Sequence, residues 1–594
     1  MSYTAPTRDL AFACSELADL EGVSQLPGFE EATADMLEAI LEEAGKFGSE
    51  VLAPINHSGD QQGARLENGQ ALTADGWKPA YQQFIESGWN GLPFSPEYGG
   101  QGLPWLIATA VNEIWHASNM AFALCPLLTQ GAIEAILAHG SVQQQQDYLS
   151  KLVSGEWTGT MNLTESQAGS DLSAVKTRAK PNGDHYLLTG QKIYITYGDH
   201  DLTENIIHLV LARLPDAPEG VKGISLFIVP KFLRDEDGSW TRRNDVETLS
   251  LEKKLGIHAS PTAVLGYGNN GGAVGYLVGE ENQGLMYMFT MMNVARHSVG
   301  VQGYALADRA YQQAVHFASD RTQGRAIDSP NGERVSIIDH PDVQRLLWVQ
   351  KCRNESLRSL GLVTAACMDK AERHPEAETR KAAAEIVEVM TPIVKGYSTE
   401  IGLENVSLAL QVHGGMGFIE ETGAAQHYRD QRITPIYEGT TGIQAMDLLG
   451  RKLLRDGGQM TGRVIDYIRQ DSSELTGISP EMADSLQKGL DALSAAAQDL
   501  VQAAAKDIRI PAAVAEPYLR LWGVVVCGWQ MAKAANRSKV LIDQGASDTF
   551  YSNKIQTAEF YFSSEMPKMN YLAETIRKSG ELVSETEVEA FQVA

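Results

Sequence analysis

Cysteine and positive charge are both scarce in this chain of 594 residues. Its 5 cysteines are an odd number without C-x-x-C spacing, so we expect neither a disulfide framework nor a structural metal site, and a reducing compartment fits best. Lys and Arg number 49 against 75 Asp and Glu, which gives a net charge of -26. This charge repels phosphate backbones, so no nucleic-acid partner is expected, and any anionic substrate needs a specific basic pocket.

Long uninterrupted apolar runs are also scarce. The first residues carry acids where a secretory peptide needs an apolar run, and they lack the Arg-rich character of a transit peptide. The most apolar windows, Met120–Ala138 and Leu521–Ala532, are interrupted by Gln130 and Glu134 or are too short for the roughly 20 residues of a spanning helix. We expect a cytoplasmic protein without a membrane segment.

The composition that is present fits a large globular protein, with 43% apolar residues and only 22 prolines. Helical spacing of apolar residues, then short strand-like runs between Gly, Pro and Asp clusters, then helical spacing again predict a mainly α protein with a central β domain. The expected domains are helical 1–156, antiparallel β 157–282, helical 283–456 and an additional C-terminal helical domain 457–594. This order lacks the strand–helix alternation of a doubly wound sheet.

Several elements can be placed from periodicity alone. The expected strands are His185–Thr189, Lys192–Thr196, Ile206–Ala212 and Ile224–Pro230, and the expected helices are Leu285–Asp320, Pro341–Arg373, Glu376–Gln411, Gly442–Leu454 and Met482–Lys506. The last of these is rich in Ala and Asp rather than basic, which favours interdomain or dimer packing over a membrane anchor.

The segment Met161–Asp171 offers hydroxyl and backbone donors without bulk. Thr164, Ser170 and the flexible Gly169 suit a planar heteroaromatic ring that carries hydrogen-bond acceptors. Taken alone, the segment is more often an ordinary capped turn.

The strand Lys192–Thr196 places Tyr194 and Thr196 on one face if it alternates regularly. An aromatic ring and a hydroxyl on one face can stack on a flat ligand and hydrogen-bond its edge. A plain core strand is the alternative.

The segment Gln411–Phe418 is a glycine-rich turn that would let the backbone approach a pyrophosphate. It follows a helical pattern instead of a strand, so it is not the dinucleotide-binding fingerprint. A helix C-cap is the alternative interpretation.

Glu438 stands between Tyr437 and Gly439 just before a new helix, so its carboxylate can project into a cleft. A solvated charge or an acid at a helix start is the alternative.

These four segments, in this order, resemble the acyl-CoA dehydrogenase family over about residues 30–455. The motifs are T-E-x-x-x-G-S-D at 164–171, K-x-x-I-T at 192–196, Q-x-x-G-G-x-G at 411–417 and I-Y-E-G-T-x-x-I-Q at 436–444. Residues 291–296, residues 195–201 and the extra C-terminal block are similar to the long branch of the family, which includes the 3-methylmercaptopropionyl-CoA dehydrogenases.

The resemblance implies FAD between the β domain and the C-terminal helices, with part of its pocket from a second subunit of a homodimer or dimer of dimers. The residues it implies for FAD are Leu163, Thr164, Gly169, Tyr194, Thr196, Arg321, Gln411, Gly415 and Thr440. For the acyl-CoA substrate they are Ser170, Asn293, Arg296 and Gly439, with no metal. For Arg296 the alternative is an ion pair with an acid elsewhere in the helical domain.

The resemblance also implies the chemistry. Glu438 would take the α-proton while the β-hydride passes to the flavin, and burial should raise the pKa of this base. Some branches place the base just before the CoA-binding arginine, where this chain has Ala295, so Glu438 is the expected base.

The implied function is dehydrogenation of an acyl-CoA to trans-2-enoyl-CoA in fatty-acid β-oxidation, with electrons passed to electron-transfer flavoprotein. The alternatives are a 3-methylthiopropionyl-CoA dehydrogenase, an acyl-CoA oxidase that uses O2, and a noncatalytic CoA-binding protein.

Overall fold

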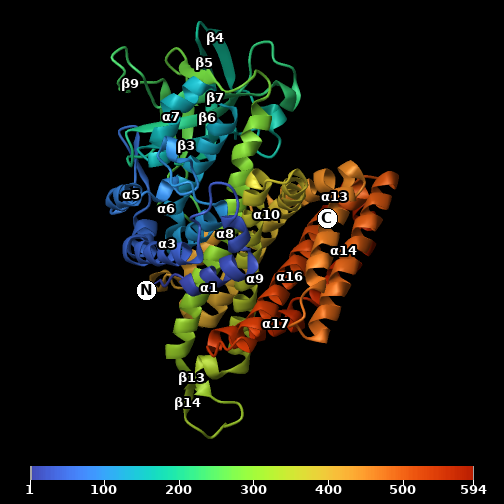
Figure 1. Ribbon diagram of the computed structural model, residues 1–594. Coiled ribbons are helices and arrows are strands. Elements are labelled where there is room, and N and C mark those ends of the chain that lie inside the picture. Colours follow the sequence, from blue (N-terminus) through green and yellow to red (C-terminus); the bar gives the residue numbers. More distant parts are fainter. Residues whose placement is uncertain (1–2, 593–594) are drawn as a thin grey trace.

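The computed structural model describes residues 3–592. A β domain lies at one end of a large helical body, and the C-terminal helices form a separate layer beside the central ones (Figure 1). This arrangement confirms the expected mainly α fold with a central β domain.

The N-terminal region is helical apart from one small hairpin, β1 (Arg65–Glu67) and β2 (Gln70–Leu72). Its helices are α1 (Thr7–Phe12), α2 (Leu20–Ser24), α3 (Ala34–Phe47), α4 (Ala53–Gln62), α5 (Trp77–Glu86), α6 (Trp105–His139) and α7 (Val142–Ser154). A capping box of Ser141 and Gln144 begins α7, and Gly155 ends it in the left-handed region.

Helix α6 forms the core of this region. It bends at Asn119, whose φ of −158° and ψ of 90° are not helical. Among the described residues it is the one helix long and apolar enough to cross a membrane by length and composition. However, 89% of its most apolar window is buried inside the protein, as in the core helix of a globular domain.

The β domain contains a sheet in the order β10-β11-β5-β12-β7-β6-β3, with β4 paired to β5. Its strands are β3 (Trp157–Asn162), β4 (Arg178–Asn182), β5 (His185–Thr196), β6 (Asn205–Ala212), β7 (Ser225–Pro230), β10 (Val246–Leu251), β11 (Thr262–Tyr267) and β12 (Ala273–Leu277). A short side hairpin comprises β8 (Phe232–Leu233) and β9 (Arg242–Arg243).

Two expectations for this domain were wrong. The two strands expected within 185–196 are one strand, β5. The sheet is also not purely antiparallel, because β3 and β6 pair in parallel. The chain passes through the β4–β5 hairpin between them, which supplies the crossover that a parallel pair requires.

Regular alternation fails at the end of β5. The register against β11 shifts between Ala263 and Leu265, and Tyr194 has a left-handed φ of 61°. The argument that alternation sets Tyr194 and Thr196 on one face therefore does not hold, because a bulge resets the side-chain period.

Three long helices form the centre of the protein: α8 (Gly284–Asp320), α9 (Pro341–Arg373) and α10 (Ala377–His413). Their bounds lie within two residues of those expected from the sequence. Helices α8 and α10 approach closely at Gly300 and Gly303, where a Cβ atom would lie 2.5 Å from Val394 Cγ1 and 2.6 Å from Ser398 O. This close approach brings the middle of α10 against the first half of α8.

The far end of α8 leads into a hairpin of β13 (Thr322–Arg325) and β14 (Arg334–Ser336), which projects from the body (Figure 1). After α10 the chain forms α11 (Ala424–Gln431) and α12 (Thr441–Asp447). The single helix expected at 442–454 is α12 followed by a wider π-helical segment, Leu448–Leu453.

The C-terminal layer consists of α13 (Gln459–Ser473), α14 (Pro480–Lys506), α15 (Arg509–Ala513), α16 (Ala515–Asp543), α17 (Thr549–Ser564) and α18 (Lys568–Ser584). Helix α16 buries Trp522 and Trp529 and packs against α9, α10 and α12. The Ala-rich α14 packs against α16 and α18 within the C-terminal layer, and its expected role in interdomain or dimer packing stays a prediction.

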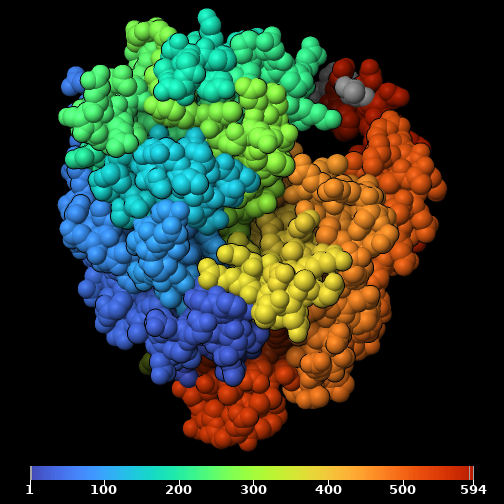
Figure 2. Space-filling view, turned by 45° about the horizontal axis from the view of Figure 1, so that its top comes forward, coloured from blue at the N-terminus to red at the C-terminus, as the bar shows by residue number. Residues whose placement is uncertain are grey.

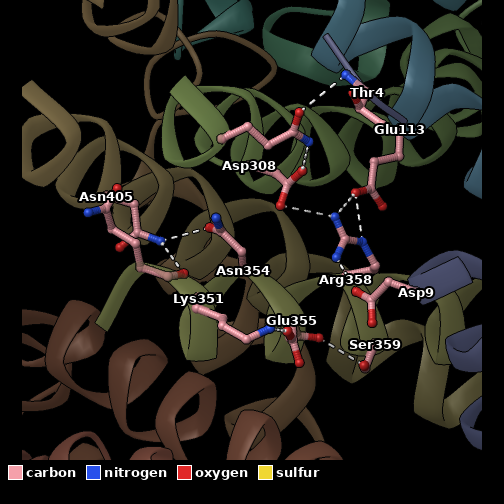
Figure 3. A network of polar contacts seen from close by, with 12 residues as sticks. Thr4, Asp9, Glu113, Asp308, Lys351, Asn354, Glu355, Arg358, Ser359 and Asn405 are labelled. Atoms are coloured by element: carbon pink, nitrogen blue, oxygen red, sulfur yellow. Dashed lines mark hydrogen bonds and ion pairs between the residues drawn. The ribbon is translucent and has the colours of Figure 1, made fainter. Parts of the chain in front are cut away.

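A network of buried charges joins distant parts of the chain (Figure 3). Arg358 on α9 donates to Glu113 on α6 at 2.8 Å, lies 3.4 Å from Asp308 on α8 and binds Asp9 on α1. Lys554 on α17 binds the other oxygen of Asp9. The network thereby holds the N-terminal segment and the C-terminal layer against the central helices.

Candidate active site

Glu438 lies in a tight turn between α11 and α12. Its φ is 54°, and the next residue, Gly439, has a φ of 90°. The side-chain amide of Gln444 donates to the carbonyls of both residues, at 3.2 Å and 3.3 Å. A left-handed non-glycine residue held by surrounding hydrogen bonds is the kind of local strain found at functional sites.

The turn is fixed on its C-terminal side as well. Thr440 is the N-cap of α12 and accepts a hydrogen bond from the Ile443 N–H at 3.3 Å. Thr441 donates to Glu400 on α10 at 2.6 Å. These two hydrogen bonds tie the start of α12 to α10 and thereby fix the C-terminal side of the Glu438 turn.

The electrostatic surroundings suit a base. Part of Glu438 remains accessible, but protein surrounds its carboxylate, and this burial raises its pKa to about 7. The positive charges of Arg296 and Lys395 oppose the rise. A carboxylate with a pKa close to neutral is a far stronger base than an ordinary Glu, whose pKa is about 4.3.

Arg296 projects from α8 toward the same turn. It is only 4% exposed and donates to Asp447 on α12 at 3.3 Å. Burial lowers its pKa, while Asp447 and Glu438 act in the other direction. The ion pair within the helical domain, which was the alternative interpretation, is present, and a contact of Arg296 with CoA stays a prediction.

Lys395 was missed by the sequence argument. It lies on α10, is fully buried, and donates its ammonium to the Gly439 carbonyl at 2.6 Å. Burial lowers the pKa of Lys395 to about 7. The available signal was a single lysine within the apolar run Met390–Tyr397, where a charge is costly.

The first two motifs meet through a buried ion pair. Glu165 and Lys192 lie 2.8 Å apart, and Lys192 also donates to the Leu163 carbonyl at 2.9 Å. Despite its burial, the pKa of Glu165 is lowered to about 2, chiefly by Lys192. The Ile193 N–H donates to the Thr164 carbonyl at 2.9 Å. The two segments expected to contact one flat ring are therefore side by side.

The other residues expected to contact FAD or the substrate differ in burial. Ser170, Gly169 and Asn293 are exposed, Thr196 is half-buried, and Ala295 is buried beside Arg296. The alternative position for the base therefore carries no carboxylate. In Figure 2 the surface is hollowed between the β domain and the C-terminal helices.

A second group of expected residues lies elsewhere. Arg321, Gln411 and Gly415 are exposed at the far ends of α8 and α10, where Phe317 stacks on His413 with ring centroids 4.6 Å apart. At about 1.5 Å per helical residue, Arg321 lies roughly 37 Å along α8 from Arg296. One chain does not bring the two groups together.

The glycine turn in this second group ends a helix. Gly414 has a φ of 60° and follows the last residue of α10, His413. The helix C-cap interpretation is therefore confirmed, while contact of Gly415 with a pyrophosphate stays a prediction.

The fold combines a central β domain with helical regions before and after it, and the site holds one carboxylate of raised pKa, Glu438, near Arg296 and Lys395. Family models for acyl-CoA dehydrogenase match the N-terminal domain at 34–156, the middle domain at 160–267 and the C-terminal domain at 282–454. A further model, acetyl-CoA dehydrogenase C-terminal like, matches residues 462–587. The chain belongs to the acyl-CoA dehydrogenase family and is an enzyme of this type.

The chain is similar over most of its length to individual members of the family. The chain is 48% identical over 565 residues to 3-methylmercaptopropionyl-CoA dehydrogenase of Ruegeria pomeroyi, covering 94% of this chain and 95% of that protein. It is 31% identical to a butyryl-CoA dehydrogenase of Syntrophomonas wolfei, covering 96% of each. An acyl-CoA dehydrogenase of Bacillus anthracis complexed with FAD has the same fold, with a TM-score of 0.72, 21% identity, and coverage of 95% of this chain and 91% of that one.

Proposed function

We propose that the protein is an FAD-dependent dehydrogenase that forms the α,β double bond of a short acyl-CoA, with 3-methylthiopropionyl-CoA as its first candidate substrate. The observation that carries the proposal is the Glu438 turn, a strained base with a pKa near neutral. The 48% identical relative supports the methylthio substrate over the ordinary fatty acyl substrate that we first expected. Butyryl-CoA is the second candidate, supported by the 31% identical relative.

The geometry fits the flavin. Thr164 and Thr196 present half-buried hydroxyl groups from adjacent segments, and Tyr194 is 61% exposed although it is a large aromatic residue. An exposed aromatic ring and hydroxyl groups are the kinds of group that suit the face and edge of a planar ring system. When bound there, FAD supplies the acceptor for the β-hydride.

The turn itself can serve the substrate. Its carbonyls face Gln444 and Lys395, while no described residue accepts a hydrogen bond from the Glu438 N–H. That N–H is available to the thioester oxygen, where negative charge develops as Glu438 removes the α-proton. Exclusion of water by the surrounding helices keeps the carboxylate weakly solvated and therefore basic.

The proposal predicts anaerobic bleaching of the flavin by a suitable acyl-CoA. We expect kcat/KM for 3-methylthiopropionyl-CoA to exceed that for butyryl-CoA by about tenfold, the usual scale for a one-group change in an apolar pocket. Stopped-flow flavin reduction over a series of chain lengths measures this. A preference for butyryl-CoA would support the second candidate, and no bleaching by any acyl-CoA would contradict the dehydrogenase assignment.

The electron acceptor and the setting are part of the proposal. We propose electron-transfer flavoprotein as acceptor, a cytoplasmic location and a role outside long-chain β-oxidation. Peroxide formation in air at the rate of turnover would instead identify an acyl-CoA oxidase, because only an oxidase passes its electrons efficiently to O2.

We also propose that two copies of the chain complete each FAD site. Arg321, Gln411 and Gly415 lie too far from Glu438 to share one FAD with it within a single chain. Their end of the protein also exposes large apolar side chains, with Phe418 89% and Ile327 81% exposed. Such exposure in a folded protein is typical of an interface.

Arg321→Ala should weaken FAD retention and dimer stability together. A guanidinium–phosphate hydrogen bond is worth about 1.5–3 kcal/mol, so FAD affinity should fall roughly tenfold to a hundredfold. FAD release and sedimentation of the same samples measure both effects. Arg325→Ala, at the end of the exposed strand β13 that follows Arg321, is the matched control. Unchanged FAD affinity in Arg321→Ala would contradict the shared site.

A further inference from the structure

Lys395 occupies an unusual place for a lysine. It lies in the stretch Met390–Thr399 of α10, every residue of which is buried, opposite the close approach of α8. Its side chain has no exposed surface, and its hydrogen bond is to a neutral acceptor, the Gly439 carbonyl, at 2.6 Å. An ammonium group so far from water is costly unless something in its surroundings requires it.

No carboxylate forms a salt bridge with Lys395 among the described residues. Three charged groups act on it through space: Glu438 from the turn, Arg296 from α8 and Glu400 from α10 itself. Glu400 is already engaged by Thr441, and Arg296 by Asp447. Glu438 is therefore the one acid of this cluster that has neither an ion-pair partner nor a hydrogen-bond donor for its carboxylate.

The hydrogen bond acts on the residue that follows the base. Gly439 carries a φ of 90°, and its carbonyl points inward to Lys395 and Gln444. Holding this carbonyl fixes the peptide plane between Gly439 and Thr440, while Gln444, which also donates to the Glu438 carbonyl at 3.2 Å, holds the plane between Glu438 and Gly439. The two donors together hold the turn that contains the left-handed Glu438. Lys395 thus acts on Glu438 in two ways: its hydrogen bond holds the backbone of the turn, and its charge lowers the pKa of the carboxyl group.

We propose that Lys395 is a positioning residue for the base: its ammonium group clamps the Gly439 carbonyl to hold the strained turn, and its charge favours the ionised form of Glu438. The inference rests on the proposed function, because it requires Glu438 to be the base. Lys395 does not touch the reacting atoms, so its removal should slow the chemical step without abolishing substrate binding.

Three substitutions separate the two contributions. Lys395→Met removes the donor and the charge but keeps an unbranched chain of similar length. Lys395→Gln keeps a donor without a charge, and Lys395→Arg keeps both. Lys533→Met is the matched control, because Lys533 on α16 also donates to a backbone carbonyl, that of Leu17 at 2.9 Å, away from the Glu438 turn.

The expected pH effect has a definite sign. A neighbouring cation favours the carboxylate, so its loss raises the pKa of Glu438 and moves the acidic limb of the flavin-reduction rate to higher pH, by about one unit. Lys395→Met and Lys395→Gln should both show this shift, and Lys395→Arg should not. At a pH above the limb, Lys395→Met should still lose about tenfold in kcat with KM little changed, and Lys395→Gln should recover part of that loss.

A second readout does not depend on turnover. Infrared difference titration of each variant, with Glu438→Gln to assign the band, reports the protonation of Glu438 directly. Lys395→Met should show the band of the protonated carboxyl persisting to higher pH than in the wild type. FAD content and thermal midpoint, measured on the same samples, identify a variant that is merely misfolded.

The outcomes keep the two proposals apart. Wild-type activity that survives in Glu438→Gln would overturn the assignment of the base. An inactive Glu438→Gln together with a Lys395→Met variant whose pH profile and kcat match the Lys533→Met control would overturn the role of Lys395 alone. A Lys395→Met variant whose KM rises while its pH profile stays fixed would also overturn it.

Discussion

Glu438→Gln should lose nearly all turnover while keeping the fold, FAD and acyl-CoA binding. The amide is nearly the same size as the carboxylate but cannot accept the α-proton. Loss of a general base typically costs about 10²–10⁴-fold, and the upper end applies here because the alternative position for the base is Ala295, which has no carboxylate. Anaerobic flavin reduction by 3-methylthiopropionyl-CoA measures the effect.

The control lies on α12, the helix that follows the turn. Gln444→Glu would add a charge and also remove a donor to the turn, so its effects could not be separated. Asp447→Asn is the better control, because it changes the partner of Arg296 and leaves Glu438 unchanged. FAD content and acyl-CoA binding of Glu438→Gln should match those of the wild type. Flavin reduction at the wild-type rate in Glu438→Gln would show that another group removes the proton.

The long helices could be predicted from sequence because their burial repeats with the helical period. Helix α9 begins and ends at Pro341 and Arg373, as expected, since Pro favours the first turn and basic residues favour the last. The π-helical segment after Asp447 could not be foreseen, because the apolar pattern there fits a regular helix equally well.

The β domain shows the limit of pattern arguments. Each strand pattern is local, but the parallel pairing of β3 with β6 joins segments separated by two other strands. The bulge at Tyr194 is equally hidden, since the residue in the left-handed conformation is not a glycine. Tertiary contacts, such as the bond between Ile193 and Thr164, override the local preference.

The sequence predicted the site residues that lie within a motif, but not the contacts that residues distant in sequence make with them. Glu438 was identified by its own sequence surroundings. The partnership of Arg296 with Asp447 joins residues 151 positions apart, and that of Lys395 with Gly439 joins residues 44 apart. The charges that tune the base are thus set by helix packing, which no single motif encodes.

The buried charges around Arg358 lead to the second large effect. Arg358→Met should destabilise the protein by about 3–5 kcal/mol, because it leaves the buried carboxylate of Glu113 without its cation. Arg345→Met is the matched control: Arg345 pairs with Asp342 on the same helix, but both are exposed, and such pairs contribute about 0–1 kcal/mol. Thermal and denaturant unfolding of both variants measure the difference.

A double substitution tests whether the loss of stability comes from the unpaired carboxylate of Glu113. Arg358→Met with Glu113→Gln removes one uncompensated carboxylate, so it should be more stable than Arg358→Met alone although it carries one more substitution. Because Asp9 also binds Lys554 on α17, Arg358→Met should expose α17 to limited proteolysis sooner than Arg345→Met does. Equal stability of Arg358→Met and Arg345→Met would show that the network does not hold the C-terminal layer against the central helices.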